Sequence, residues 1–137
     1  MLLLKHGYKY YSMEKLYIER TDRTPEIEFT NGKIRIWGTI VPENPDEFFN
    51  VLHEWVKEYL KSPDKETTIE IGIIYTRQNP MNYLQKLLQE LILLKSEQHQ
   101  VIINWYYCMN SIDVKAGEYL SRKLNYSFNY VEVEGIW

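Results

Sequence analysis

The sequence predicts an α/β fold in which a mixed sheet of five or six strands carries about three helices, mostly on one face. An Asn-Gly pair between two apolar runs indicates a hairpin near the N-terminus, and three amphipathic segments then alternate with strand-like segments. Right-handed connections place consecutive helices on the same face of a sheet unless the strand order reverses. At 137 residues, the chain is expected to form one domain with its own core.

The predicted N-terminal elements are short strands. Residues 16–20 have the composition of a strand, and residues 26–29 and 33–38 flank an Asn-Gly turn at residues 31–32. Asn-Gly between apolar runs favours a tight hairpin loop. We therefore expect the two flanking segments to pair as antiparallel strands.

The first helix is predicted over residues 45–61. Asn44 suits the N-cap, Pro45 suits the first helical position, and Asp46 and Glu47 place negative charge in the first turn. Apolar residues then recur at helical spacing, so one face of this helix should pack on the sheet. That face consists of Phe48, Phe49, Leu52, Trp55, Val56, Tyr59 and Leu60.

Two strands joined by a second helix form the predicted centre of the sheet. Strands are expected over residues 67–76 and 100–107, and the helix between them is expected to use Asn79 as its cap and to run from Pro80 to about residue 95. Because both strands become continuously apolar and one helix connects them, they should be adjacent, parallel and central.

The last two elements have weaker patterns. A third helix is predicted over residues 111–123, and its sparse apolar content favours packing near an edge of the sheet. Residues 128–134 alternate between apolar and polar side chains, as a final strand would.

Composition excludes several classes of function. Sixteen basic and nineteen acidic residues give a net charge of −3, and no basic tract is longer than a pair, so nucleic acid is not the expected partner. No apolar run approaches the roughly 20 residues that span a bilayer, so membrane insertion is not expected. Cys108 is the single cysteine, which favours a cytoplasmic location.

The chain shows no pattern typical of an enzyme, a metal site or a cofactor site. His6, His53 and His99 are scattered, and His53 lacks a second histidine at the spacing of a zinc-binding helix. Cys108 has no base nearby in the sequence, and no glycine-rich phosphate loop is present. We expect a protein without catalytic residues, metal or cofactor.

Three short motifs, taken in order, resemble those of one known family. Residues 23–27 read Arg-Thr-Pro-Glu-Ile, residues 42–44 read Pro-Glu-Asn at a helix start, and residues 105–107 end a strand with Trp-Tyr-Tyr. In this order and spacing they resemble the SiaC family of bacterial regulatory phosphoproteins, over about residues 13–132. The resemblance implies a fold similar to the sulfate-transporter and anti-sigma-antagonist (STAS) domain. It also implies a SiaC-like domain over residues 13–137 and a non-conserved arm over residues 1–12, with Met13 as an alternative start.

The resemblance implies a signalling adaptor rather than an enzyme. In the family, the unphosphorylated protein binds and activates a diguanylate cyclase, which makes cyclic di-GMP. A dedicated serine/threonine kinase phosphorylates a threonine in the turn before the second helix, and a PP2C-type phosphatase removes the phosphate. By resemblance, such a kinase, phosphatase and cyclase are the expected protein partners of this chain.

The corresponding turn here is Thr76-Arg77-Gln78-Asn79, and it departs from the family. Aligned on Tyr75, Gln78 stands where the family has its phosphorylated threonine. Glutamine has no hydroxyl to accept a phosphoryl group and carries no charge, so it is similar to a permanently unmodified state. Thr76 is the candidate substitute phosphoacceptor; alternatively, Thr76 completes the strand and Asn79 caps the helix. A helix N-terminus would stabilise a phosphate at this turn.

A second interpretation is a small oligomeric scaffold without a phosphorylation switch. Twelve tyrosines provide side chains with an apolar body and a polar tip, which suit a partner surface. In this interpretation Tyr83, Tyr106 and Tyr107 would cover the interface of a homo-oligomer.

Overall fold

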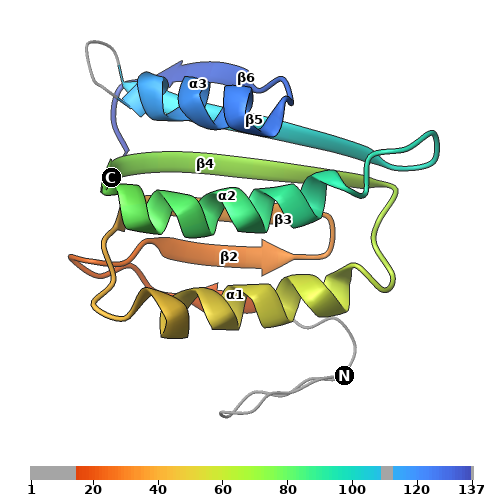
Figure 1. Cartoon of the computed structure of the whole chain (residues 1–137), viewed down its shortest axis with the longest axis horizontal. Coiled ribbons are helices and arrows are strands. Elements are labelled where there is room, and N and C mark those ends of the chain that lie inside the picture. Colours follow the sequence, from red (N-terminus) through yellow and green to blue (C-terminus); the bar gives the residue numbers. More distant parts are fainter. Residues whose placement is uncertain (1–14, 109–112, 137) are drawn as a thin grey trace.

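The computed structural model describes residues 15–108 and 113–136. Within these residues, six strands and three helices follow one another in the predicted order. Figure 1 shows the helices lying across the sheet. In chain order they are β1 (Leu16–Ile18), β2 (Glu26–Thr30), β3 (Lys33–Ile40), α1 (Pro45–Tyr59), β4 (Glu66–Thr76), α2 (Gln78–Ile92), β5 (Gln100–Cys108), α3 (Asp113–Leu124) and β6 (Asn129–Val133). The expected arm, residues 1–12, lies outside the described residues.

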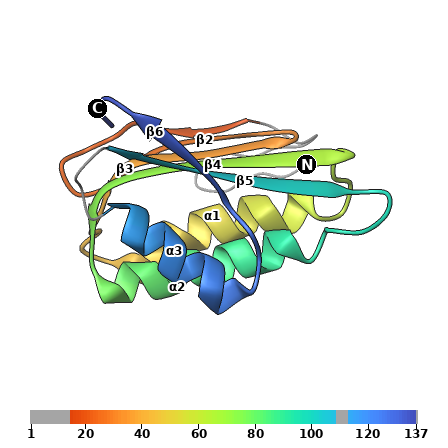
Figure 2. The ribbon, with the colours of Figure 1, turned by 90° about the horizontal axis from the view of Figure 1, so that it is seen from above.

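The strands form one mixed sheet whose spatial order equals the chain order, β1-β2-β3-β4-β5-β6. The first three strands pair antiparallel, and β3, β4, β5 and β6 pair parallel. Because the strand order never reverses, the three connections place all three helices on one face, which Figure 2 shows from above. The predicted fold class is therefore confirmed.

The hairpin and the central strand pair are also confirmed. Thr30 pairs with Lys33 across a two-residue turn. Strand β4 pairs with β5 in parallel, with Ile69 opposite Ile103 and Ile71 opposite Trp105. Both strands have a neighbour on each side, so neither is an edge strand.

The core lies between the sheet and the helical layer. Helices α1 and α2 bury their apolar faces in this core. Trp55, on the predicted apolar face of α1, is 8% exposed, and Leu88 of α2 is 0% exposed. Helix α3 lies over β5, one strand in from the edge strand β6, with Leu120 fully buried. The largest fully buried side chains include Trp105, Tyr59, Phe29 and Phe49.

The start of the second helix differs from the prediction. The structure begins α2 at Gln78, so Arg77 occupies the cap position, and no side chain caps the helix. The prediction that Asn79 caps the helix is therefore wrong. Pro80 becomes the third helical residue, which is tolerated because the first N–H groups of a helix have no partner within it. The helix ends at Ile92 rather than near residue 95.

Candidate functional site

The turn before α2 lies at the end of the sheet where both α1 and α2 begin. This position follows from the topology, because parallel strands joined by right-handed crossovers place the helix starts at the carboxyl ends of the strands. Arg77, Gln78 and Asn79 are exposed, whereas Pro80 is buried. The turn is thus an accessible surface built on rigid elements.

Gln78 lies where the sequence places it, exposed in the first turn of α2. Its side-chain amide donates a hydrogen bond to Asn82 Oδ1 at 2.9 Å, one helical turn further on. The carboxamide therefore lies along the helix surface and has no nucleophilic hydroxyl. No acidic residue occupies the first turn of this helix.

Thr76 is the last residue of β4 and is half-buried. Its hydroxyl donates a hydrogen bond of 2.8 Å to the carbonyl oxygen of Ile40, at the end of the neighbouring strand β3. This bond joins the ends of two parallel strands and would have to break before the oxygen could accept a phosphoryl group.

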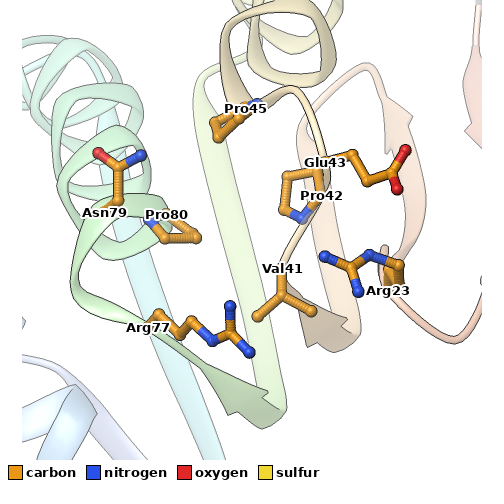
Figure 3. A pocket seen from close by; sticks show the side chains of 8 residues that line it. All are labelled: Arg23, Val41, Pro42, Glu43, Pro45, Arg77, Asn79 and Pro80. Atoms are coloured by element: carbon orange, nitrogen blue, oxygen red, sulfur yellow. The ribbon is translucent and has the colours of Figure 1, made fainter.

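The turn borders a surface pocket of about 540 Å³ that the sequence did not reveal. The loop after β3 provides one wall and the start of α2 the other, and Figure 3 shows the side chains. The lining residues are Arg23, Val41, Pro42, Glu43, Pro45, Arg77, Asn79 and Pro80. Of the predicted turn, Arg77 and Asn79 belong to this pocket, while Thr76 and Gln78 do not line it.

Arg23 reaches the pocket from the loop between β1 and β2. Within this loop, Thr21 Oγ1 accepts hydrogen bonds from the backbone N–H groups of Arg23 and Thr24, at 3.2 and 3.0 Å. The N–H of Val41 donates to the carbonyl of Arg23 at 2.8 Å, which ties the loop to the exit of β3. In the sequence, residues 23–27 stood out only as a motif similar to the family. That motif did not predict that Arg23 would line this pocket.

Arg77 enters the pocket from the opposite side. Its Nε donates to the Tyr75 hydroxyl at 3.4 Å, and its guanidinium carbon lies 5.9 Å from the centre of the Tyr75 ring. Tyr75 is 50% exposed and Ile74 is 44% exposed, because β4 continues past its pairing with β5, which ends at Gly72. The aromatic side chain of Tyr75 is thus accessible next to Arg77, and the aliphatic side chain of Ile74 is accessible one residue earlier in the strand.

The sheet face without helices carries a second polar arrangement. Arg35 stacks on Trp37, with its guanidinium carbon 4.1 Å from the ring centre. The Nη1 atom of Arg35 lies 3.9 Å from the carboxylate oxygen Oε1 of Glu70. The Tyr106 hydroxyl donates to Glu70 at 3.0 Å. Partial burial and this hydrogen bond raise the pKa of Tyr106. The Trp37 ring lies over Gly72, where a Cβ would come within 2.8 Å of it.

The three tyrosines of the scaffold interpretation do not share one surface. Tyr106 lies on the helix-free face, since its neighbour Trp105 faces α3 and successive strand residues alternate. Tyr83 lies in the helical layer, where it stacks on Phe49 at 5.1 Å and donates a hydrogen bond to Asp46. Tyr107 packs against the core. One flat interface therefore cannot contain all three side chains.

The described residues hold no group of three or more His, Cys, Asp or Glu side chains that could bind a metal ion. Among the helices of residues 15–108 and 113–136, none is long and apolar enough to cross a membrane. Cys108 ends β5 and is half-buried.

Within the described residues, the mixed six-stranded sheet with its three helices on one face defines a protein of the α/β class. Residues 18–133 match the family described as "SiaC family regulatory phosphoprotein". The chain belongs to the SiaC family.

Individual proteins and solved structures are also similar to this chain. The chain is 26% identical over 101 residues to an uncharacterized protein of Pseudomonas aeruginosa (strain UCBPP-PA14), covering 69% of this chain and 77% of that one. The solved structure of SiaC of Pseudomonas aeruginosa is similar with a TM-score of 0.75 and 21% identity, covering 87% of this chain and 97% of that one. A structure of the diguanylate cyclase SiaD in complex with its activator SiaC also matches, with a TM-score of 0.75 and 22% identity over 85% and 97% of the two chains. At these identities the solved structures establish the fold.

Proposed function

We propose that this chain is a non-enzymatic adaptor of the SiaC type that works in the cytoplasm and binds a diguanylate cyclase through the surface around Thr76, Arg77, Gln78 and Asn79. Family membership and the similarity to a SiaC that is the activator of its cyclase support this proposal. The observation that carries it is the exposed turn itself, which begins α2 beside a pocket and follows the exposed end of β4, where Ile74 and Tyr75 are accessible.

The adaptor is proposed to remain in the unmodified, binding-competent form. Gln78 stands at the family's phosphoacceptor position and offers an amide already bonded to Asn82. The kinase and phosphatase expected from the family would then find no acceptor at this position. Thr76 remains the substitute acceptor to be tested, although its hydroxyl is bonded to Ile40.

The first test measures cyclase binding and activation. Tagged wild type, Gln78→Glu and the control Gln98→Glu are used to capture partners from native lysate, and a captured cyclase is then assayed for cyclic di-GMP synthesis. Gln98 is exposed and follows α2, so the control adds the same charge far from the turn. We expect Gln78→Glu to weaken capture and activation, because a charge inside an interface must lose its water without gaining a partner. Equal capture by all three proteins would contradict the proposed surface.

The second test concerns phosphorylation. Wild type, Thr76→Val and Gln78→Thr are incubated with native lysate and ATP, and phosphorylated residues are mapped by mass spectrometry. The proposal expects no phosphate in the turn of the wild-type protein. A phosphate at Thr76 that disappears in Thr76→Val would instead show a working switch at the substitute position.

A further inference from the structure

The pocket between the starts of α1 and α2 holds two positive charges that face each other. Figure 3 shows the guanidinium groups of Arg23 and Arg77 directed toward each other from opposite walls, with Val41 between them, and the carboxylate of Glu43 directed away. Neither arginine forms an ion pair with any residue that the structure describes. We infer that this pocket binds an acidic side chain, Asp or Glu, that a partner protein presents to it.

The two helix starts differ in a way that favours this ligand at α2. In α1, Asn44 accepts a hydrogen bond from the Glu47 N–H, and Asp46 and Glu47 already supply negative charge. In α2 there is neither a side-chain cap nor an acidic residue in the first turn. The first turn of α2 therefore supplies no negative charge to the positive end of its dipole, and a carboxylate beside Arg77 would be stabilised there.

Contacts within the protein hold the backbone of Arg23 and the side chain of Arg77 before a ligand binds. The Val41 N–H holds the backbone of Arg23, and the hydrogen bond to Tyr75 orients Arg77. Pro42, Pro45 and Pro80 form part of the walls, and proline restricts backbone motion. Less conformational entropy is lost when a ligand binds a site that is already ordered.

The chemistry favours a carboxylate from a protein over a polyanion. A guanidinium matches a carboxylate with two parallel hydrogen bonds, and the apolar prolines and Val41 can contact the rest of a peptide segment. Nucleic acids and anionic membranes need more positive charge than two arginines, and the chain as a whole carries −3. The pocket is thus a local positive site on an acidic protein.

This inference deepens the proposed function by naming the partner group that would occupy the pocket, and its test needs no cyclase. The ¹⁵N-labelled full chain is titrated, with NMR detection, with the acetylated and amidated peptide Leu-Glu-Asp-Leu. The neutral peptide Leu-Gln-Asn-Leu and inorganic phosphate serve as alternative probes. We expect saturable shifts of the Arg77 Nε–H signal and of the Gln78 and Asn79 amides with the acidic peptide only.

Three variants locate the binding. Arg23→Gln and Arg77→Gln should each abolish the saturable shifts, while Arg122→Gln, an equal charge change on the exposed last turn of α3, should preserve them. Thermal unfolding of all variants checks that they remain folded. An equal loss with Arg122→Gln would indicate only general charge attraction and would overturn the inference.

Other results would also overturn it. If phosphate saturates the NMR shifts at a lower concentration than the acidic peptide does, the pocket is a phosphate site. If the neutral peptide binds as well as the acidic peptide, charge has no role in the binding. If the acidic peptide binds but no cyclase is captured, only the proposed function fails; if a cyclase is captured and the peptide does not bind, only this inference fails.

Discussion

At the scale of single residues, Gly117 sets how closely α3 approaches the sheet. A Cβ on this residue would lie 2.7 Å from Trp105 Cγ and Cδ2, and Trp105 is fully buried. Overpacking of this kind costs about 1–3 kcal/mol, whereas alanine gains at most about 1 kcal/mol over glycine in a helix. We therefore expect Gly117→Ala to lower the free energy of unfolding in chemical denaturation. The exposed neighbour Glu118 provides the control, Glu118→Ala; a Gly117→Ala protein as stable as wild type would disprove the contact.

Two leucines near each other in sequence should lose very different amounts of stability when changed to alanine. Leu88 is fully buried under the sheet, whereas Leu93 is 81% exposed just after α2. Leu88→Ala should reduce the free energy of unfolding by about 2–5 kcal/mol, because it removes apolar contacts and leaves a cavity. Leu93→Ala should change it by less than about 0.5 kcal/mol. Urea denaturation of both variants measures this difference, and a loss under about 1 kcal/mol at Leu88 would contradict its role in the core.

Tyr106 should make the free energy of unfolding fall as the pH becomes alkaline. Partial burial and the hydrogen bond to Glu70 raise its pKa above the usual 10.0, so the unfolded chain releases the phenolic proton first as the pH rises. This contribution to stability is complete below about pH 10 and is lost as the pH rises through the folded-state pKa. Tyr106→Phe should therefore be less stable than wild type at neutral pH, and the difference should shrink at about pH 10.5. Denaturation of both proteins at the two pH values tests this. An equal stability difference between wild type and Tyr106→Phe at both pH values would refute it.

At the scale of elements, α2 is a helix whose first turn lacks the negative charge that its dipole favours. Gln78→Glu supplies it, and Asn82 can rotate its amide to donate to the new carboxylate. We expect a gain of roughly 0.3–1 kcal/mol in low salt, and screening should reduce it at high salt. Gln89→Glu is the matched control, since the same charge near the carboxyl end of α2 should be neutral or destabilising. Chemical denaturation at two salt concentrations measures both; identical effects of the two substitutions would exclude the dipole as the cause.

At the scale of the whole molecule, the strands and helices that the structure describes lie between Leu16 and Val133. The family match also begins at residue 18, well after the predicted arm at residues 1–12. We therefore expect a chain beginning at Met13 to fold with a melting temperature within about 4 °C of the full chain, the shift that about 1 kcal/mol produces. Circular dichroism melts of the two chains test this, and a larger drop would show that the arm contributes to stability.

The sequence was informative wherever structure depends on neighbouring residues. The Asn-Gly hairpin, the apolar face of α1 and the buried runs of β4 and β5 follow from local periodicity, and all were predicted. The start of α2 was not, because proline is tolerated at several positions in a first helical turn, so Asn79-Pro80 fits more than one register. The pocket was missed because Arg23 and Arg77 lie far apart in the chain. They line the same pocket because a hydrogen bond from the Val41 N–H ties the loop that carries Arg23 to the end of β3.

The order of the strands has a consequence for how the protein is made. Each strand pairs with the one synthesised immediately before it, from β1 at one edge to β6 at the other. A chain emerging from the ribosome can thus extend the sheet by one strand at a time, without waiting for a distant segment to insert between two existing strands. Since pairings between distant segments slow folding and prolong the exposure of unpaired strand edges, this topology shortens the period in which the nascent chain can aggregate.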